Sequence, residues 1–575
     1  MQARRLFGVV FAVAALGAAC GPSPDPNEPR TTASASNSAA VSASASASAS
    51  TPPPDPNDPF AVEVSQRDEE LPILKGPKPT IADAALEPPP AGVPAAPKSC
   101  DAWIKRKAGA APKSCATKPL ALASLAEALD LTDDARDAAL LALESCEGLP
   151  AGTVRSLHIE LAPVECGDEL AQPILKAKPA GMPGSIQHTL IGQALSARLS
   201  RAVGSPPQLE PPFTKKRVEA FTAGPVKKWF DEQAVAIKTL AQQGFALVGF
   251  GRGLVAINAG WADLRMVEVV RDVPISNEMK SDPELANAYY AKLDELLEPR
   301  KQRGRDAALV GLREMANTGI LMDSRVRQTR SLLAKLYGGR RVDSLDILAV
   351  PETPLRADET DVERKLAAKL PTFFAGEILD PATATDPAML AALGVHGIPL
   401  WFRSAVKDAG DTLSPAARAA YARLRVRLAL VYWRAFDVEA SIAHFAKLDR
   451  ATLSPEDEFF FALAIALRNG PQDVAGLMLQ TEPFTPKFGD VRAFDAVASK
   501  TYATPTTIGG LAAFDAAVLR QIAVPRDADG AYWLALQKRY DDAVSKLEDA
   551  KLRDEAAERG RAAGATAKIL KTSQP

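Results

Sequence analysis

The sequence predicts an all-α protein in which a helical array, an α-solenoid or a similar stack of helix pairs, follows a disordered N-terminal tether. Alanine, leucine and charged residues dominate the chain, whereas the alternating Val/Ile/Tyr pattern of strands is scarce. Proline and glycine separate the periodic apolar segments. A pattern of large and small residues also recurs between residues 415 and 560. Together these observations favour stacked helices over a sheet.

The first twenty residues have the layout of a secretory signal. Two arginines precede an uncharged apolar run over residues 6–16, and small residues stand directly before Cys20. The run is too short to span a bilayer, which needs about 20 apolar residues. The segment resembles the lipobox of bacterial lipoproteins, in which the cysteine is diacylated and becomes the mature N-terminus, although Gly17 stands where that family prefers Leu. The resemblance implies a signal peptide over residues 1–19 and lipidation of Cys20; the alternative is ordinary cleavage that leaves Cys20 a free thiol.

Residues 20–60 form the predicted linker. Pro, Ser and Ala dominate this segment, so it lacks the apolar bulk that a packed core requires. We expect a flexible chain of about 35 Å average length that ties the lipid anchor to the folded body. The acidic segments DPNE (25–28) and DPND (55–58) are interpreted as solvated linker, because prolines separate their carboxylates and no completing calcium loop follows.

Four cysteines remain if Cys20 is lipidated, and an exported, oxidising compartment favours their pairing. No C-x-x-C motif occurs, which argues against thioredoxin-like chemistry and zinc knuckles. The sequence APKSC ends at both Cys100 and Cys115, in stretches with little regular structure. We favour a pairing of each with Cys146 or Cys166, because weak local structure gains most from a cross-link. The local pairs Cys100–Cys115 and Cys146–Cys166 stay open.

The first half of the body reads as successive helices. Residues 120–146 predict two, the second opening at Asp133 or Asp134. Four leucines are expected on one side of the first helix: Leu120, Leu122, Leu125 and Leu129. Further helices are predicted at 185–203, 226–247, 252–271, 283–297, 304–317, 323–337, 361–370 and 387–394. Two isolated segments, EVVRDVPIS (268–276) and RRVDSLDILAVP (340–351), are the candidates for short strands.

The second half carries the recurring pattern. Leu428, Ala429 and Tyr432 are followed thirty-five residues later by Leu463, Ala464 and Leu467, and a weaker copy lies around Tyr540 and Ala543. The pattern resembles tetratricopeptide-type repeats in degenerate form, with Gln480 in an aromatic place; an irregular helical bundle is the alternative. The resulting domain plan has a disulfide-containing helical region (61–180), a central helical region (181–410), tetratricopeptide-like repeats (411–560) and a C-terminal tail (561–575).

No catalytic, cofactor or metal site is predicted. The glycines at 249, 251 and 253 lack the spacing of a phosphate-binding loop, and we interpret them as sites of close helix contact or a helix break. The four histidines form no metal or catalytic motif, and His158 and Glu160, two residues apart, point to opposite faces of a helix. The aromatic cluster at 394–406 is interpreted as a packing wedge between helical subdomains, with a ligand groove as the alternative.

Charge and layout lead to the functional expectation. Lys plus Arg (68) nearly matches Asp plus Glu (70), which gives no reason to expect nucleic acid as a partner. We expect a lipoprotein of the bacterial cell envelope, in the outer membrane and facing the periplasm or the cell surface, that binds an envelope protein or peptide and is not an enzyme. The alternative is an envelope hydrolase that uses carboxylates without a readable motif.

Overall fold

A computed structural model describes residues 57–64, 82–110, 115–321, 323–336, 342–351, 360–379, 415–432, 434–468, 491–503 and 506–572. Within these ranges every regular element is helical, and none is a strand, which confirms the all-α fold class. None of these helices is long and apolar enough to cross a bilayer.

The first half of the chain contains η1 (Lys98–Cys100), α2 (Asp101–Ile104), α3 (Lys118–Asp130), α4 (Asp133–Ala142), η2 (Leu143–Ser145), α5 (Thr153–Leu161), η3 (Val164–Cys166), α6 (Gly167–Lys176), α7 (Gly184–Ala202), α8 (Lys215–Phe221), the π-helix η4 (Thr222–Val226), α9 (Lys227–Phe245), α10 (Gly249–Arg271) and α11 (Asn277–Lys280). The second half contains α12 (Pro283–Asn317), α13 (Ser324–Leu336), η5 (Val342–Ile347), α14 (Asp361–Lys369), α15 (Thr372–Leu379), α18 (Pro415–Tyr432), α19 (Ala435–Phe445), η8 (Arg450–Thr452), α20 (Pro455–Leu467), α22 (Arg492–Ser499), α23 (Ile508–Ile522), α24 (Gly530–Lys546) and α25 (Ala550–Thr572).

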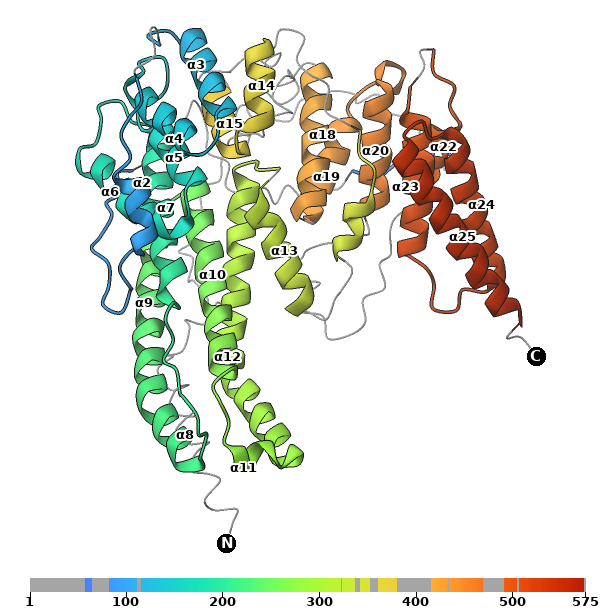
Figure 1. The fold of residues 1–575 in the computed structure, drawn as a ribbon. Coiled ribbons are helices and arrows are strands. Elements are labelled where there is room, and N and C mark those ends of the chain that lie inside the picture. Colours follow the sequence, from blue (N-terminus) through green and yellow to red (C-terminus); the bar gives the residue numbers. More distant parts are fainter. Residues whose placement is uncertain are drawn as a thin grey trace, which may run out of the picture.

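Long helices form one side of the molecule. α10 lies at their centre and packs on α7, α9 and α12, while α8 and α11 cap the far end (Figure 1). Glycines permit this close packing: a Cβ at Gly192 of α7 would lie 2.6 Å from the Gly251 Cα of α10, and one at Gly260 would lie 2.7 Å from the Gly304 oxygen of α12. The interpretation of the 249–253 glycines as close-contact residues is therefore confirmed for Gly251.

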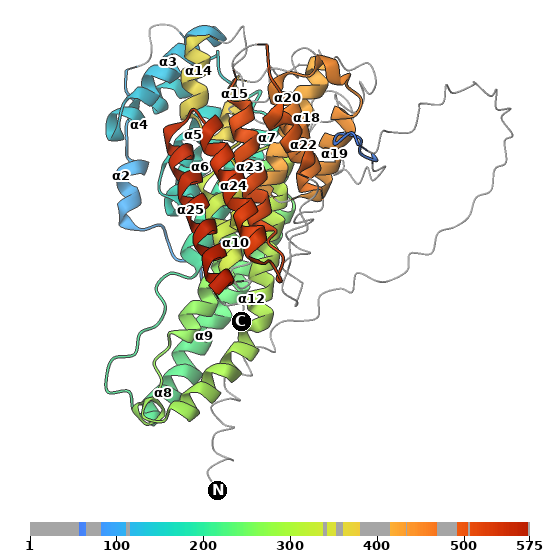
Figure 2. The same ribbon diagram turned by 90° about the vertical axis from the view of Figure 1, so that its right-hand side faces the viewer.

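The C-terminal helices α18 to α25 pack each on the next in chain order, at the opposite side of the molecule (Figures 1 and 2). The large and small residues of the recurring pattern are buried there, including Leu428, Tyr432, Leu463 and Tyr540. All residues of α20 from Asp457 to Leu467 are buried, because α18, α19, α22 and α23 surround this helix. One continuous apolar core runs from α3 through α12 to α25.

Several details differ from the sequence predictions. The helices expected at 283–297 and 304–317 are one helix, α12, which continues through Pro299. Proline removes only one main-chain hydrogen bond, and directly beyond it Arg300 and Arg303 each lie 2.6 Å from the Asp263 carboxylate of α10 and hold the helix in place. Leu120 is 44 % exposed rather than buried beside Leu122 and Leu125, since it stands in the first turn of α3.

The two candidate strands are also absent from the described residues. Residues 268–271 end α10, and 342–347 form η5, because neither segment has a partner strand to complete a hydrogen-bond ladder. Residues 561–572, assigned to a tail, continue α25. The helix predicted at 387–394 and the aromatic cluster at 394–406 lie outside the described residues.

Candidate functional site: two docking sites for the N-terminal segment

The helical body holds a non-helical, proline-rich stretch of its own chain, residues 82–97, which we call the strap. Side chains of α7 and α9 bind five of its main-chain carbonyl groups: those of Ala82, Ala84, Glu87, Gly92 and Pro94. The order of the contacts shows that the strap runs in the same direction as α7. Strap side chains Leu86 and Val93 pack against the apolar core formed by α7, α9 and α10. Recognition therefore combines main-chain hydrogen bonds with apolar contacts, the combination by which proteins bind extended peptides.

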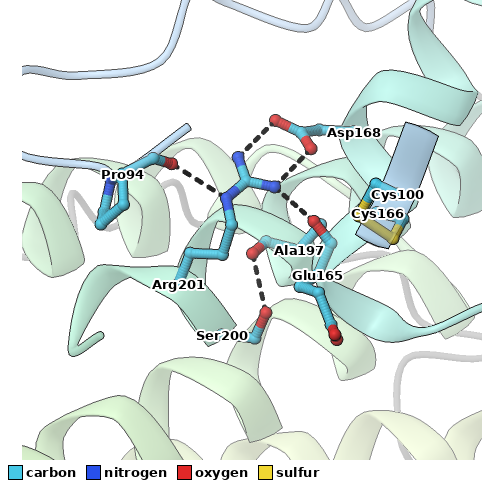
Figure 3. The surroundings of a disulfide bond; sticks show 8 residues. All are labelled: Pro94, Cys100, Glu165, Cys166, Asp168, Ala197, Ser200 and Arg201. Atoms are coloured by element: carbon cyan, nitrogen blue, oxygen red, sulfur yellow. Dashed lines mark hydrogen bonds and ion pairs between the residues drawn. A yellow bond between two sulfur atoms is a disulfide. The ribbon is translucent and has the colours of Figure 1, made fainter. Parts of the chain in front are cut away.

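Two arginines of α7 make the strongest contacts with the strap. Arg201 forms a bidentate pair with Asp168 of α6, at 2.7 and 2.8 Å, and its Nε donates to the Pro94 carbonyl at 2.9 Å (Figure 3). Arg198 donates to the Glu87 carbonyl at 2.7 Å. Both guanidinium groups are buried, so Asp168 supplies the compensating charge that keeps them ionised without water.

The amide side chains and one histidine complete the row. Gln187 donates to the Ala84 carbonyl at 2.6 Å, and Gln233 donates to the Gly92 carbonyl at 2.8 Å. His188 lies with Nε2 at 2.8 Å from the Ala82 carbonyl, while its Nδ1 accepts from the Val248 amide at 3.1 Å. These two bonds assign the neutral tautomer with the proton on Nε2. His188 thus ties the beginning of the strap to the beginning of α10.

The disulfides secure the far end of the strap. The structure pairs Cys100 with Cys166, and Cys115 with Cys146, at Cα–Cα distances of 5.4 and 5.3 Å. This is one of the loop-to-helix connectivities favoured from the sequence, with the second bridge nested inside the first. Cys100 ends η1 just after the strap, and Cys166 immediately precedes α6 and its Asp168 (Figure 3). The first bridge therefore fixes the strap to the helix that carries its buried carboxylate.

A second docking site holds residues 57–64. The Phe60 side chain is 6 % exposed and packs on Phe461 of α20 with ring centroids 5.4 Å apart. The Arg450 guanidinium of η8 covers the other side of Phe60 at 4.3 Å from the ring centroid and donates to the Asp58 carboxylate at 2.7 Å. We call Arg450 and Phe461 the cradle. It belongs to the C-terminal region that was predicted to form repeats.

Two other buried ionisable groups have no role in the docking sites. His158 of α5 is fully buried, neither ring nitrogen has a hydrogen-bond partner, and burial lowers the pKa of this histidine to about 4. Glu160, two residues on, pairs instead with Arg325 and Gln193. Asp515 of α23 is also fully buried and accepts from the Ala349 amide at 2.8 Å, and burial raises its pKa well above the usual value. Each group is enclosed by the core, away from any substrate.

The described residues contain no cluster of three His, Cys, Asp or Glu side chains able to hold a metal ion. An open hollow over α25 is lined by charged side chains, but its Glu555 is paired with Arg559 at 2.9 Å. Cys20, Gln480 and His396 lie outside the described residues. Comparison with protein-family models, with curated proteins and with solved structures finds no match for this chain.

Sequence reasoning missed both docking sites. Residues 57–60 were counted with the linker, yet the second acidic segment continues into Phe60 where the first continues into Arg30. A single large apolar residue in a tether is the signal that identifies a docking point. Leu86 and Val93 carry the same signal in the strap. The carbonyl-binding side chains could not be found in this way, because Gln and Arg on a helix are ordinarily solvent-facing.

Proposed function

We propose that the protein is a lipid-anchored envelope lipoprotein whose helical body is a protein–protein interaction scaffold. The observation that carries this proposal is the strap: five consecutive carbonyl contacts show how these helices hold an extended chain. Main-chain recognition tolerates different sequences, so helical surfaces of this kind suit partners with linear segments. The alternative hydrolase lacks a comparable observation, because the most perturbed carboxylate, that of Asp515, is sealed in the core.

In this proposal Cys20 carries the lipid and residues 21–56 form the free tether. The tether confines the body near the membrane and so raises its effective concentration for envelope partners. The outer membrane is the proposed location, by resemblance to the sorting preference for a residue such as Gly21 after the lipidated cysteine. The C-terminal region 411–560 is the proposed source of much of the binding surface, whether its helix pairs stack as tetratricopeptide-like repeats or as an irregular bundle.

Two measurements test the proposal separately. Mass spectrometry of the mature N-terminal peptide should find Cys20 at the first position with acyl chains attached; a free thiol or retained residues 1–19 would remove the anchor. Chemical crosslinking in intact cells, followed by mass spectrometry, should recover envelope proteins bound to the body. Turnover of an envelope substrate by the purified body, without a recovered partner, would favour the hydrolase instead.

A further inference from the structure

The contact between Phe60 and the cradle resembles a short linear motif in its receptor. Within the motif, the Phe60 amide donates to the Asp58 carboxylate at 3.0 Å and the Ala61 amide donates to the Asp58 carbonyl at 3.0 Å. These bonds form an Asx-type turn that Asp58, Pro59 and Phe60 make without help from the body. The motif therefore carries its own conformation, so a different chain with the same residues can present the same shape.

The cradle recognises two chemical groups of this motif at once. Arg450 donates to the Asp58 carboxylate and covers the Phe60 ring, while Phe461 receives the ring from the other side. Phe461 in turn stacks on Phe445 of α19, with centroids 5.3 Å apart, so the aromatic floor is anchored in the core. The receptor is thus prebuilt by η8, α19 and α20. An acidic residue two positions before an aromatic one is the pattern it fits.

The same contact is suited to exchange. The Arg450–Asp58 ion pair is largely open to water, with side chains 44 % and 32 % exposed, so it contributes little stability. Most of the holding force therefore comes from one ring. The motif also lies on a chain whose next described segment, the strap, begins at residue 82 and is secured elsewhere, so release of Phe60 leaves the strap contacts intact.

We propose that the Arg450–Phe461 cradle is a binding site for Asp-x-Phe segments of partner proteins, which the chain's own Asp58–Phe60 occupies until a partner displaces it. The proposal rests on the scaffold function and names its partner chemistry. It also makes the tether self-inhibiting: a covalently linked segment competes at an effective concentration of about millimolar. A partner motif must then outcompete it, which restricts binding to partners present at high local concentration in the envelope.

The test uses the full-length chain and a fluorescent peptide of residues 54–64 (PDPNDPFAVEV). Fluorescence anisotropy should show binding to the Phe60→Ala protein, whose cradle is empty, and at least about tenfold weaker binding to wild type, because the tethered segment competes. A peptide with Phe60→Ala should not bind, and Asp58→Asn in the peptide should weaken binding. The Phe60→Ala/Arg450→Ala protein should lose binding, whereas Phe60→Ala/Arg526→Ala, which changes an exposed arginine elsewhere, should retain it.

Thermal melting establishes that each variant is folded, and Asp58→Ala in the protein offers a second way to loosen the motif. Failure of the peptide to bind folded Phe60→Ala and Asp58→Ala proteins would overturn the proposal and leave Phe60 as a packing contact of its own chain. Equal binding to wild type and Phe60→Ala would overturn the self-inhibition. Neither result affects recovery of crosslinked partners in cells, so failure of the scaffold function is distinguished from failure of the cradle.

Discussion

At the scale of single residues, glycine determines how closely the long helices approach. A side chain at Gly192 would overlap the Gly251 backbone, so Gly192→Ala must push α7 away from α10. We expect a loss of about 1–3 kcal/mol in the free energy of unfolding, measured by urea denaturation. Gly224→Ala is the matched control, because nothing lies within 4 Å of its Cβ position, and it should change stability by less than about 0.5 kcal/mol. Equal stability of the two variants would contradict the packing described above.

His158 should make the fold sensitive to acid. Burial lowers its pKa from 6.5 to about 4, so the unfolded chain binds a proton between these pH values that the folded chain does not. Stability from this group is therefore present above pH 6.5 and falls as pH decreases toward 4, by about 3 kcal/mol in total. The His158→Leu variant should lose this part of the pH dependence, measured by denaturation at pH 7 and pH 5. Parallel pH profiles for wild type and variant would contradict it.

At the scale of elements, the two disulfides secure the strap and the first helices. Non-reducing peptide mapping should recover the pairs Cys100–Cys166 and Cys115–Cys146. Replacing one pair by serine should lower the free energy of unfolding by about 2–4 kcal/mol, because the unfolded chain regains loop entropy. Four alkylatable thiols in native protein, or the pairs Cys100–Cys115 and Cys146–Cys166, would contradict the arrangement.

The strap should detach when Arg201 loses its planar fork. Arg201→Lys keeps the charge near Asp168 but cannot reach both carboxylate oxygens and the Pro94 carbonyl together. We expect faster hydrogen exchange of strap amides around Val93, with about 1–3 kcal/mol of local stability lost. The control is Arg561→Lys, an exposed arginine of α25, which should leave strap exchange unchanged. Unaltered exchange in Arg201→Lys would show that apolar contacts alone hold the strap.

Sequence periodicity predicted the helices well, because the buried faces of α7, α9 and α10 are continuous enough to show a pattern. It failed where tertiary contacts overrode local preference, as at Pro299, which the Asp263 contacts hold inside α12. It also failed for docking, since a carbonyl group accepts hydrogen bonds whatever its residue type. The contacts of Arg450 and Phe60 join residues nearly 400 positions apart, and local patterns carry no information about such pairs.

At the scale of the whole molecule, the core joins the two halves of the body. Tyr432 of α18 donates to the Ile320 carbonyl at 2.7 Å, and the apolar core continues from α12 into the C-terminal helices. Removal of residues 411–560 would expose this core, so a truncated chain is a poor test of where partners bind. Single substitutions in the cradle, which leave the core packed, are the better test of the C-terminal region.

The most direct measurement of the central claim, a membrane-anchored scaffold, is lysine crosslinking in intact cells followed by mass spectrometry of the co-purified proteins. We predict crosslinks from envelope proteins to exposed lysines of the C-terminal region such as Lys538, few to Lys216 at the far end of the long helices, and loss of these crosslinks in a Cys20→Ser chain. Absence of any envelope partner from cells that contain the folded, lipidated protein would contradict the account.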